Sequence, residues 1–281
     1  MTGRPEALSA DWLGASRRAT GELRRILREY PTSAERVEET GERGEGGDQT
    51  LVIDQAAEDA VFRELEKLSD GGARFSALSE ERGFVDFGSE DVLVVIDPID
   101  GSMNAKRGLT HHAISIGVAA GRTMGDMEFG YVFDFGPDEE WVARRGEGVL
   151  LNGEPLPDPP PPRHNDGRLE LVAIESADPR WIAKRMGELL DHVHRVRAMG
   201  TIAVSLCQLA QTRVDGMATL WKTRSVDAAA AQLVVRESGG VVCFPGSETP
   251  LASQLDLEPT GPVVAARTQE DLDRLAAVVS E

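Results

Sequence analysis

Apolar residues recur at helical spacing in two segments of the N-terminal region. Residues 8–29 and 54–68 each carry large apolar side chains three or four positions apart, which predicts two amphipathic helices. Between them, residues 31–50 are polar and contain four glycines, and we expect a flexible loop. This loop leads into the second helix, so it could act as a mobile lid over a site or be only a connector.

Short apolar runs replace the helical pattern after residue 70. Residues 73–81 and 92–97 are each apolar and end on acids, as expected of buried strands. Residues 111–133 and 140–151 alternate apolar runs with glycine and acidic turns, which predicts a meander of strands.

A proline-rich stretch, residues 155–168, marks the clearest boundary in the chain. Consecutive prolines cannot enter a sheet or a helix interior and form a stiff spacer. Beyond it strands and helices alternate to the end of the chain. The pattern predicts an α/β protein, with one subdomain over residues 1–158 and a second over residues 159–281.

Charge narrows the classes of partner. The net charge of −18 would repel phosphodiester backbones, so we expect no nucleic-acid partner. Almost all basic residues are arginine, because the lysines are only Lys67, Lys106, Lys184 and Lys222. An acid-rich, lysine-poor surface suits concentrated salt, where self-repulsion is screened, and we expect a halophilic source. An ordinary acidic cytosolic protein is the alternative.

The chain carries no sign of a membrane or secretory location. No apolar run is long enough to cross a bilayer, and the first residues lack the pattern of a signal peptide. Cys207 and Cys243 lie in apolar contexts without metal-ligand spacing, which favours two free thiols. We therefore expect a cytoplasmic protein.

The most informative stretch is VLVVIDPIDGSMN, residues 92–104. An apolar strand ends on Asp97, Pro98 interrupts it, and a turn could bring Asp100 back beside Asp97. Gly101 and Ser102 would then open a helix whose free N–H groups bind an anion. Two acids beside an anion site require a divalent cation between them. Taken alone, the motif could equally be an Asx-turn before a capped helix.

Other acids favour the metal interpretation. Glu80 closes the preceding strand, and Asp227 begins an alanine-rich helix far along the chain. Oxygen ligands from three segments, without histidine or thiolate, suit Mg²⁺ better than zinc.

These residues resemble the inositol monophosphatase/fructose-1,6-bisphosphatase superfamily of Mg²⁺-dependent phosphatases, and most closely its archaeal dual-activity branch. The resemblance rests on DPIDGSMN together with these further segments: IDQAAE, the SEE pair, GEGVLLNG, MGTIAVSLCQLA and VDAAAAQLVVRESGG. It covers nearly the whole chain. It implies a layered α-β-α-β-α sandwich, Mg²⁺ as the cofactor, two or three ions per site, and a homodimer.

The resemblance also implies roles for single residues. Glu80 and Asp97 would bind a first metal with the carbonyl of Ile99, and Asp97, Asp100 and Asp227 would hold a second. The backbone of Gly101 and Ser102 would take the phosphate. The Ser102 hydroxyl, paired with Asp54, would orient the attacking water, and Glu80 would assist catalysis. Acids between Glu38 and Asp48 could reach a third, weaker metal.

This chain departs from the family pattern near Asp227. Val226 stands where tryptophan is common, and Leu220 falls on the glutamate that contacts inositol hydroxyls in animal enzymes. Lys222 and Arg224 lie close by and could bind a second phosphate, or could belong to a solvated turn.

The sequence therefore predicts a phosphoric monoester hydrolase acting on small sugar or polyol phosphates, such as inositol 1-phosphate or fructose 1,6-bisphosphate. Two alternatives remain. One is a 3′-phosphoadenosine 5′-phosphate phosphatase, although no adenine-binding insertion is apparent. The other is a non-catalytic protein that uses the fold to contact RNA or the transcription machinery.

Overall fold

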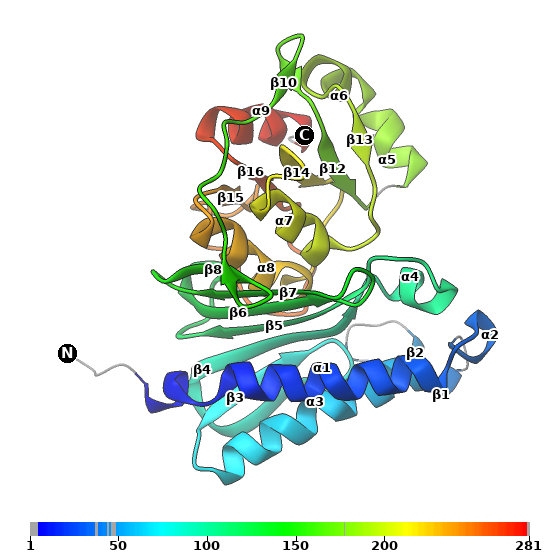
Figure 1. Cartoon of the computed structure of the whole chain (residues 1–281), viewed down its shortest axis with the longest axis vertical. Coiled ribbons are helices and arrows are strands. Elements are labelled where there is room, and N and C mark those ends of the chain that lie inside the picture. The colour runs from blue at the N-terminus through cyan, green and yellow to red at the C-terminus, as the bar shows by residue number, and fades with distance from the viewer. Residues whose placement is uncertain (1–4, 37–38, 44, 46–48, 177, 280–281) are drawn as a thin grey trace.

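The chain forms five layers that alternate helices and sheets (Figure 1). The computed structural model describes residues 5–36, 39–43, 45, 49–176 and 178–279. From the N-terminal side, the layers are a helix pair, a seven-stranded sheet, a second helix pair, a five-stranded sheet and an outer group of helices. This is the α-β-α-β-α sandwich that the family resemblance implies.

The first layer is a pair of long helices, α1 (Trp12–Glu29) and α3 (Val52–Asp70), which run antiparallel to each other (Figure 1). A short 3-10 helix, η1 (Glu6–Ser9), precedes α1. The Asp11 side chain caps α1 by accepting a hydrogen bond from the Gly14 N–H at 3.0 Å. The predicted apolar faces of both helices are buried against the sheet. Both predicted helices are confirmed within a few residues.

Residues 31–50 contain regular structure rather than the uniform loop expected from composition. The structure gives one helical turn, α2 (Ser33–Arg36), and two paired strands, β1 (Glu39–Arg43) and β2 (Gln49–Leu51). Antiparallel backbone pairing can form a hairpin without an apolar face, which is why the polar composition did not reveal it. The predicted lid and the third-metal acids between Glu38 and Asp48 fall partly outside the described residues.

The seven-stranded sheet is built entirely from residues 75–155, in sequential order. Its strands are β3 (Phe75–Ser79), β4 (Gly83–Asp100), β5 (Ala113–Ala119), β6 (Met127–Asp134), β7 (Glu139–Arg144), β8 (Gly148–Leu151) and β9 (Glu154–Pro155). The strands from β4 onward pair antiparallel with their neighbours, which confirms the predicted meander. Two short helices lie in its connections, α4 (Ser102–Arg107) and η2 (Met124–Asp126).

The middle layer consists of α7 (Ile202–Ala210) and α8 (Ser225–Glu237), which lie between the two sheets. Helix α8 is rich in alanine because it approaches β5 and β6 very closely. A Cβ atom added at Gly130 of β6 would lie 2.6 Å from the Ala230 carbonyl oxygen. Small residues on both sides thus bring the start of α8, with Asp227, over the sheet.

The second sheet uses residues 172–266, in the order β13-β12-β14-β16-β15. The strands are β12 (Val172–Glu175), β13 (Val196–Arg197), β14 (Gly216–Thr219), β15 (Val241–Cys243) and β16 (Val264–Ala266). The outer layer contains α5 (Pro179–Lys184), α6 (Met186–His192) and α9 (Gln269–Val279). Strand β15 follows α8 after only three residues. The sequence does not predict this strand, because the glycines after α8 indicate only the end of a helix.

The proline-rich stretch links the two sheets. Its first residue, Pro155, ends β9, and beyond it lies one small ladder, β10 (His164–Asn165) with β11 (Arg168–Leu169). The division into two subdomains near residue 158 remains a prediction, because α7 and α8 pack against both sheets. No helix in the part of the chain that the structure describes is long and apolar enough to span a bilayer.

Candidate active site at the junction of the sheets

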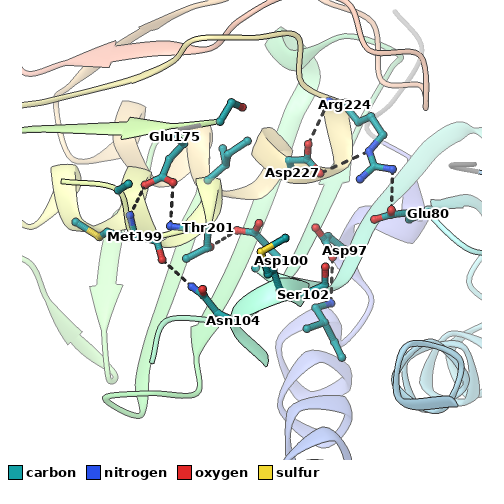
Figure 2. A pocket seen from close by; sticks show the side chains of 17 residues that line it. Glu80, Asp97, Asp100, Ser102, Asn104, Glu175, Met199, Thr201, Arg224 and Asp227 are labelled. Atoms are coloured by element: carbon teal, nitrogen blue, oxygen red, sulfur yellow. Dashed lines mark hydrogen bonds and ion pairs between the residues drawn. The ribbon is translucent and has the colours of Figure 1, made fainter. Parts of the chain in front are cut away.

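A cavity of about 440 Å³ opens where the end of β4 meets the middle helices (Figure 2). Its acidic lining residues are Glu80, Asp97, Asp100, Glu175 and Asp227. They come from four segments that are widely separated in the sequence, and a cavity of this size suits a small-molecule ligand.

The two aspartates of the DPID motif reach the cavity because of a bulge in β4. The sequence predicts that this strand ends at Asp97, but in the structure it continues to Asp100. Asp97 pairs with Ser115 and Asp100 with Ala113, so β4 carries one extra residue between these pairs. In a regular strand, residues three apart point to opposite faces, and the extra residue lets both carboxylates line one cavity.

Local hydrogen bonds hold both aspartates. Asp97 Oδ1 accepts from the Ile99 N–H at 3.0 Å, so the Asx-turn anticipated as an alternative is present within the site. Asp100 Oδ2 accepts from the Thr201 hydroxyl and, at 2.7 Å, from the Ala203 N–H at the start of α7. Asp100 therefore connects the first sheet to the middle layer.

Glu80 and Asp227 lie on the other side of the cavity and share one cation. Arg224 Nη1 lies 2.7 Å from Glu80 Oε1, and Arg224 Nε lies 4.0 Å from Asp227 Oδ1 (Figure 2). Asp227 Oδ2 also accepts from the Arg224 backbone N–H at 3.2 Å. Asp227 is the third residue of α8, and an acid at this position commonly reaches back to the residue before the helix.

Burial of these acids raises their pKa values. Burial, reinforced by the charge of Asp100, holds the pKa of Asp97 well above its usual range. Burial raises the pKa of Asp100 to about 7 against the opposing hydrogen bond from Thr201. It likewise raises the pKa of Glu80 to about 7, although Arg224 opposes the shift. Such a cluster is unfavourable unless positive charge is supplied.

The donor set fits divalent cations, but the side chains do not form a closed ligand cage. Within the described residues, no three His, Cys, Asp or Glu side chains are arranged to hold one ion. The Arg224 guanidinium contributes one positive charge beside Glu80 and Asp227. The cavity thus has five acidic side chains and one guanidinium, and oxygen-only donors suit Mg²⁺.

The residues predicted to bind phosphate also lie in this cavity. Gly101 and Ser102 line it, with Gly101 in the left-handed region at a φ of 83°. A Cβ there would lie 3.0 Å from the His111 carbonyl oxygen, so only glycine fits. The predicted partner of Ser102, Asp54, is not among the cavity-lining residues, and its carboxylate lies 3.6 Å from Lys106 Nζ.

The two cations proposed for a second phosphate differ in position. Arg224 lines the cavity, whereas Lys222 is exposed and is not among the residues that line it. The structure thus brings together Glu80, Asp97, Ile99, Asp100, Gly101, Ser102, Arg224 and Asp227, and leaves Asp54 and Lys222 outside the cavity wall.

Sequence reasoning missed two cavity residues that fix the loop before α7. Glu175 accepts from the N–H groups of Met199 and Gly200, both at 2.9 Å, and from the Ser205 hydroxyl at 2.6 Å. Asn104 Nδ2 donates to the Met199 carbonyl at 2.7 Å. Glu175 is an acid that directly follows an apolar run, as Asp97 is in β4. This sequence pattern could have identified Glu175 as a candidate site residue.

Thr201 should matter to both stability and metal affinity, because its hydroxyl contacts Asp100 and also accepts from the Val204 N–H at 3.2 Å as the cap of α7. We expect Thr201→Ala to lower the free energy of unfolding by about 1 kcal/mol through the lost cap. We also expect it to weaken Mg²⁺ binding by about tenfold, as loss of a ligand's hydrogen-bond partner does. Urea denaturation and Mg²⁺ titration measure the two effects. Thr201→Ser keeps the hydroxyl and should restore both, and an equal loss in both variants would contradict the assignment.

Comparison with known proteins gives the family. The model of the inositol monophosphatase family matches residues 13–281. The chain belongs to the inositol monophosphatase family. The match includes both sheets and every residue assigned above to the cavity.

Relatives within the inositol monophosphatase family have two kinds of name. A fructose-1,6-bisphosphatase/inositol-1-monophosphatase of Thermococcus kodakarensis is 35% identical over 197 residues, covering 70% of each chain. A protein of the same name from Archaeoglobus fulgidus is 29% identical and covers 91% of this chain and 93% of its own. The Nus factor SuhB of Pasteurella multocida is 32% identical and covers 73% of this chain and 76% of its own.

Solved structures agree with the fold of this inositol monophosphatase family member. A crystal structure of an inositol monophosphatase–fructose 1,6-bisphosphatase superposes with a TM-score of 0.80 at 23% identity, covering 95% of this chain and 99% of that one. The SuhB extragenic suppressor protein of Bartonella henselae gives a TM-score of 0.75 at 22% identity, covering 95% and 97%. At these identities the likeness shows the fold alone.

Proposed function

We propose that this protein is a Mg²⁺-dependent phosphomonoesterase that hydrolyses sugar or polyol phosphates. The observation that supports this most directly is the convergence of Glu80, Asp97, Asp100 and Asp227 on one cavity beside Gly101 and Ser102. Family membership and the archaeal relatives named for fructose-1,6-bisphosphatase and inositol-1-monophosphatase support the same reaction class.

In this proposal the carboxylates divide between two cations. Glu80, Asp97 and the Ile99 carbonyl would hold one, and Asp97, Asp100 and Asp227 would hold the other after moving closer together, because no three acids are arranged around one point among the described residues. Bound Mg²⁺ lowers the pKa of water and neutralises charge on phosphoryl and leaving oxygens. Thr201 and the Ala203 N–H keep Asp100 aimed into the cavity.

The other residues would position the ester and the water. The backbone at Gly101 and Ser102 would contact the phosphate, and the Ser102 hydroxyl would orient the attacking water. Asp54 lies by Lys106, one turn of α4 beyond Ser102, and its partnership with Ser102 would need a side-chain movement.

Substrate choice would follow from the loop between β14 and α8. Leu220 is buried outside the cavity wall and offers no acceptor for a polyol hydroxyl, whereas Arg224 lines the cavity and carries a guanidinium suited to a phosphate oxygen. These two residues favour a sugar bisphosphate over an unsubstituted polyol phosphate. Assembly as a homodimer and function in concentrated salt belong to the same proposal.

An alternative of a different class, a protein that contacts the transcription machinery, corresponds to the Nus factor name of the SuhB relatives, but the family match does not favour it. This alternative predicts binding to a transcription complex without ester hydrolysis. The acidic composition, with a net charge of −18, argues against direct RNA binding.

A substrate panel tests the proposal. Phosphate release is measured with inositol 1-phosphate, fructose 1,6-bisphosphate, glucose 1-phosphate and 3′-phosphoadenosine 5′-phosphate, each in low and high salt, with Mg²⁺ and with chelator. We expect Mg²⁺-dependent release from fructose bisphosphate or inositol phosphate, with more activity in high salt. Release from none of the four would overturn the proposal, and preference for the adenosine compound would reassign the substrate.

A further inference from the structure

Arg224 lies beside two of the acids of the proposed metal site. Its guanidinium contacts Glu80 at 2.7 Å and approaches Asp227 at 4.0 Å, and these two acids would bind different cations (Figure 2). The three side chains are 14–21% exposed, so the ion pairs are mostly shielded from water. The guanidinium therefore lies between two acids that the metal ions would need.

The charges around the cavity explain why an arginine is held there. Among the described residues that line the cavity, Arg224 is the one with a positive charge. Burial alone would lower the pKa of Arg224, but the charges of Glu80, Asp227 and Asp97 raise it instead. Without the guanidinium, the carboxylates would repel one another across a space of low dielectric constant.

The same contacts make the arginine a competitor for cations. A Mg²⁺ ion needs free carboxylate oxygens within a short coordination distance, and a bound guanidinium covers one oxygen of Glu80 and faces one of Asp227. The Arg224 backbone is fixed before α8 by its N–H bond to Asp227, but the side chain has rotatable bonds and can leave.

We propose that Arg224 is an exchangeable internal counter-ion: its guanidinium neutralises Glu80 and Asp227 until Mg²⁺ displaces it, and the released guanidinium then binds the substrate phosphate. The first step rests on the Mg²⁺ binding of the proposed function, and the second step rests on its ester hydrolysis as well. Cation entry and phosphate recognition are thereby coupled through one side chain. The metal-free site stays folded, and the phosphate-binding cation becomes available only when the metals are in place.

The test is Mg²⁺ titration of substrate-free protein by isothermal calorimetry after removal of metal with chelator. We expect Arg224→Gln to tighten Mg²⁺ binding by about tenfold, because a competing charge within about 4 Å is removed. Arg224→Lys keeps the charge but not the planar fork, and its affinity should fall between the two. At saturating Mg²⁺, Arg224→Gln should raise KM for the phosphate ester more than it lowers kcat.

The matched control is Arg122→Gln, which removes the same charge from an exposed pair with Glu90 beyond the opposite end of β5. We expect it to change Mg²⁺ affinity by less than about twofold in physiological salt, where distant charges are screened. A merely structural role for Arg224 would move affinity in the opposite direction, since loss of structure weakens binding.

The outcomes separate this inference from the proposed function. Equal or weaker Mg²⁺ binding by Arg224→Gln overturns the counter-ion inference, as does unchanged affinity in Arg224→Lys if the glutamine variant fails to fold. Tighter binding without hydrolysis of any ester supports the counter-ion and overturns the phosphatase proposal. Failure of the wild-type protein to bind Mg²⁺ overturns both.

Discussion

Replacing Asp97 by asparagine should abolish ester hydrolysis while making the metal-free protein more stable. Asparagine keeps the shape and can still accept the hydrogen bond from the Ile99 N–H. It removes a carboxylate proposed to contact both cations. Loss of an outer partner of a metal ligand costs about 10- to 100-fold, so loss of the ligand should lower kcat by more than about 100-fold. Stability should rise because Asp97 is buried at 4% exposure with a strongly raised pKa.

Phosphate release at saturating Mg²⁺ and thermal unfolding in chelator measure the two effects. Asp126→Asn is the control, since Asp126 lies at the opposite end of the sheet, where it accepts from the Thr123 N–H at 2.9 Å. That variant should lose some stability and keep its activity. Turnover of Asp97→Asn at the wild-type rate would show that the catalytic site lies elsewhere.

The metal-free protein should lose stability as pH rises, and Mg²⁺ should prevent the loss. Asp100 and Glu80 have pKa values raised to about 7 by burial. In the unfolded chain they ionise near pH ~4, so between these values the unfolded state releases protons that the folded state retains. Each acid therefore destabilises the fold progressively from about pH 4 to about pH 7, and no further above that.

Thermal unfolding at several pH values, with chelator and with Mg²⁺, measures this dependence. We expect Tm in chelator to fall between about pH 5 and about pH 7 and to level off above, whereas Tm in Mg²⁺ should stay nearly constant. Asp100→Asn should reduce the slope in chelator. A metal-free Tm that rises with pH over this range would mean that the folded state does not raise the pKa values of Asp100 and Glu80.

The layered fold follows from the sequence because its signals are local. The helical spacing over residues 8–29, the strand runs near residues 73–97 and the alternation after residue 168 each reflect burial of one face of one element. The structure places elements at all of them. Strand β15 and the β1–β2 pair escaped because backbone hydrogen bonds can form a short strand without a distinctive side-chain pattern.

The sequence predicts only part of the candidate site, for a different reason. The acids of the DPID motif and Asp227 could be named from residue type and family resemblance, and all of them line the cavity. The partner of Asp100 could not be named, because Thr201 lies 101 positions further along the sequence. The position of Arg224 between Glu80 and Asp227 depends on side-chain geometry, which no linear pattern records.

The shared middle layer has a consequence for how the chain folds during synthesis. The seven-stranded sheet is complete in sequence at Pro155, but α8, which covers the β5 and β6 face, ends only at Glu237. At typical translation rates of about 5–20 residues per second, this apolar face stays uncovered for several seconds, until α8 has been synthesised. A ribosome-bound chain of this length would expose Gly130 and its neighbours to other chains. We therefore expect the nascent chain, rather than the folded protein, to be prone to aggregation and to depend most on a chaperone.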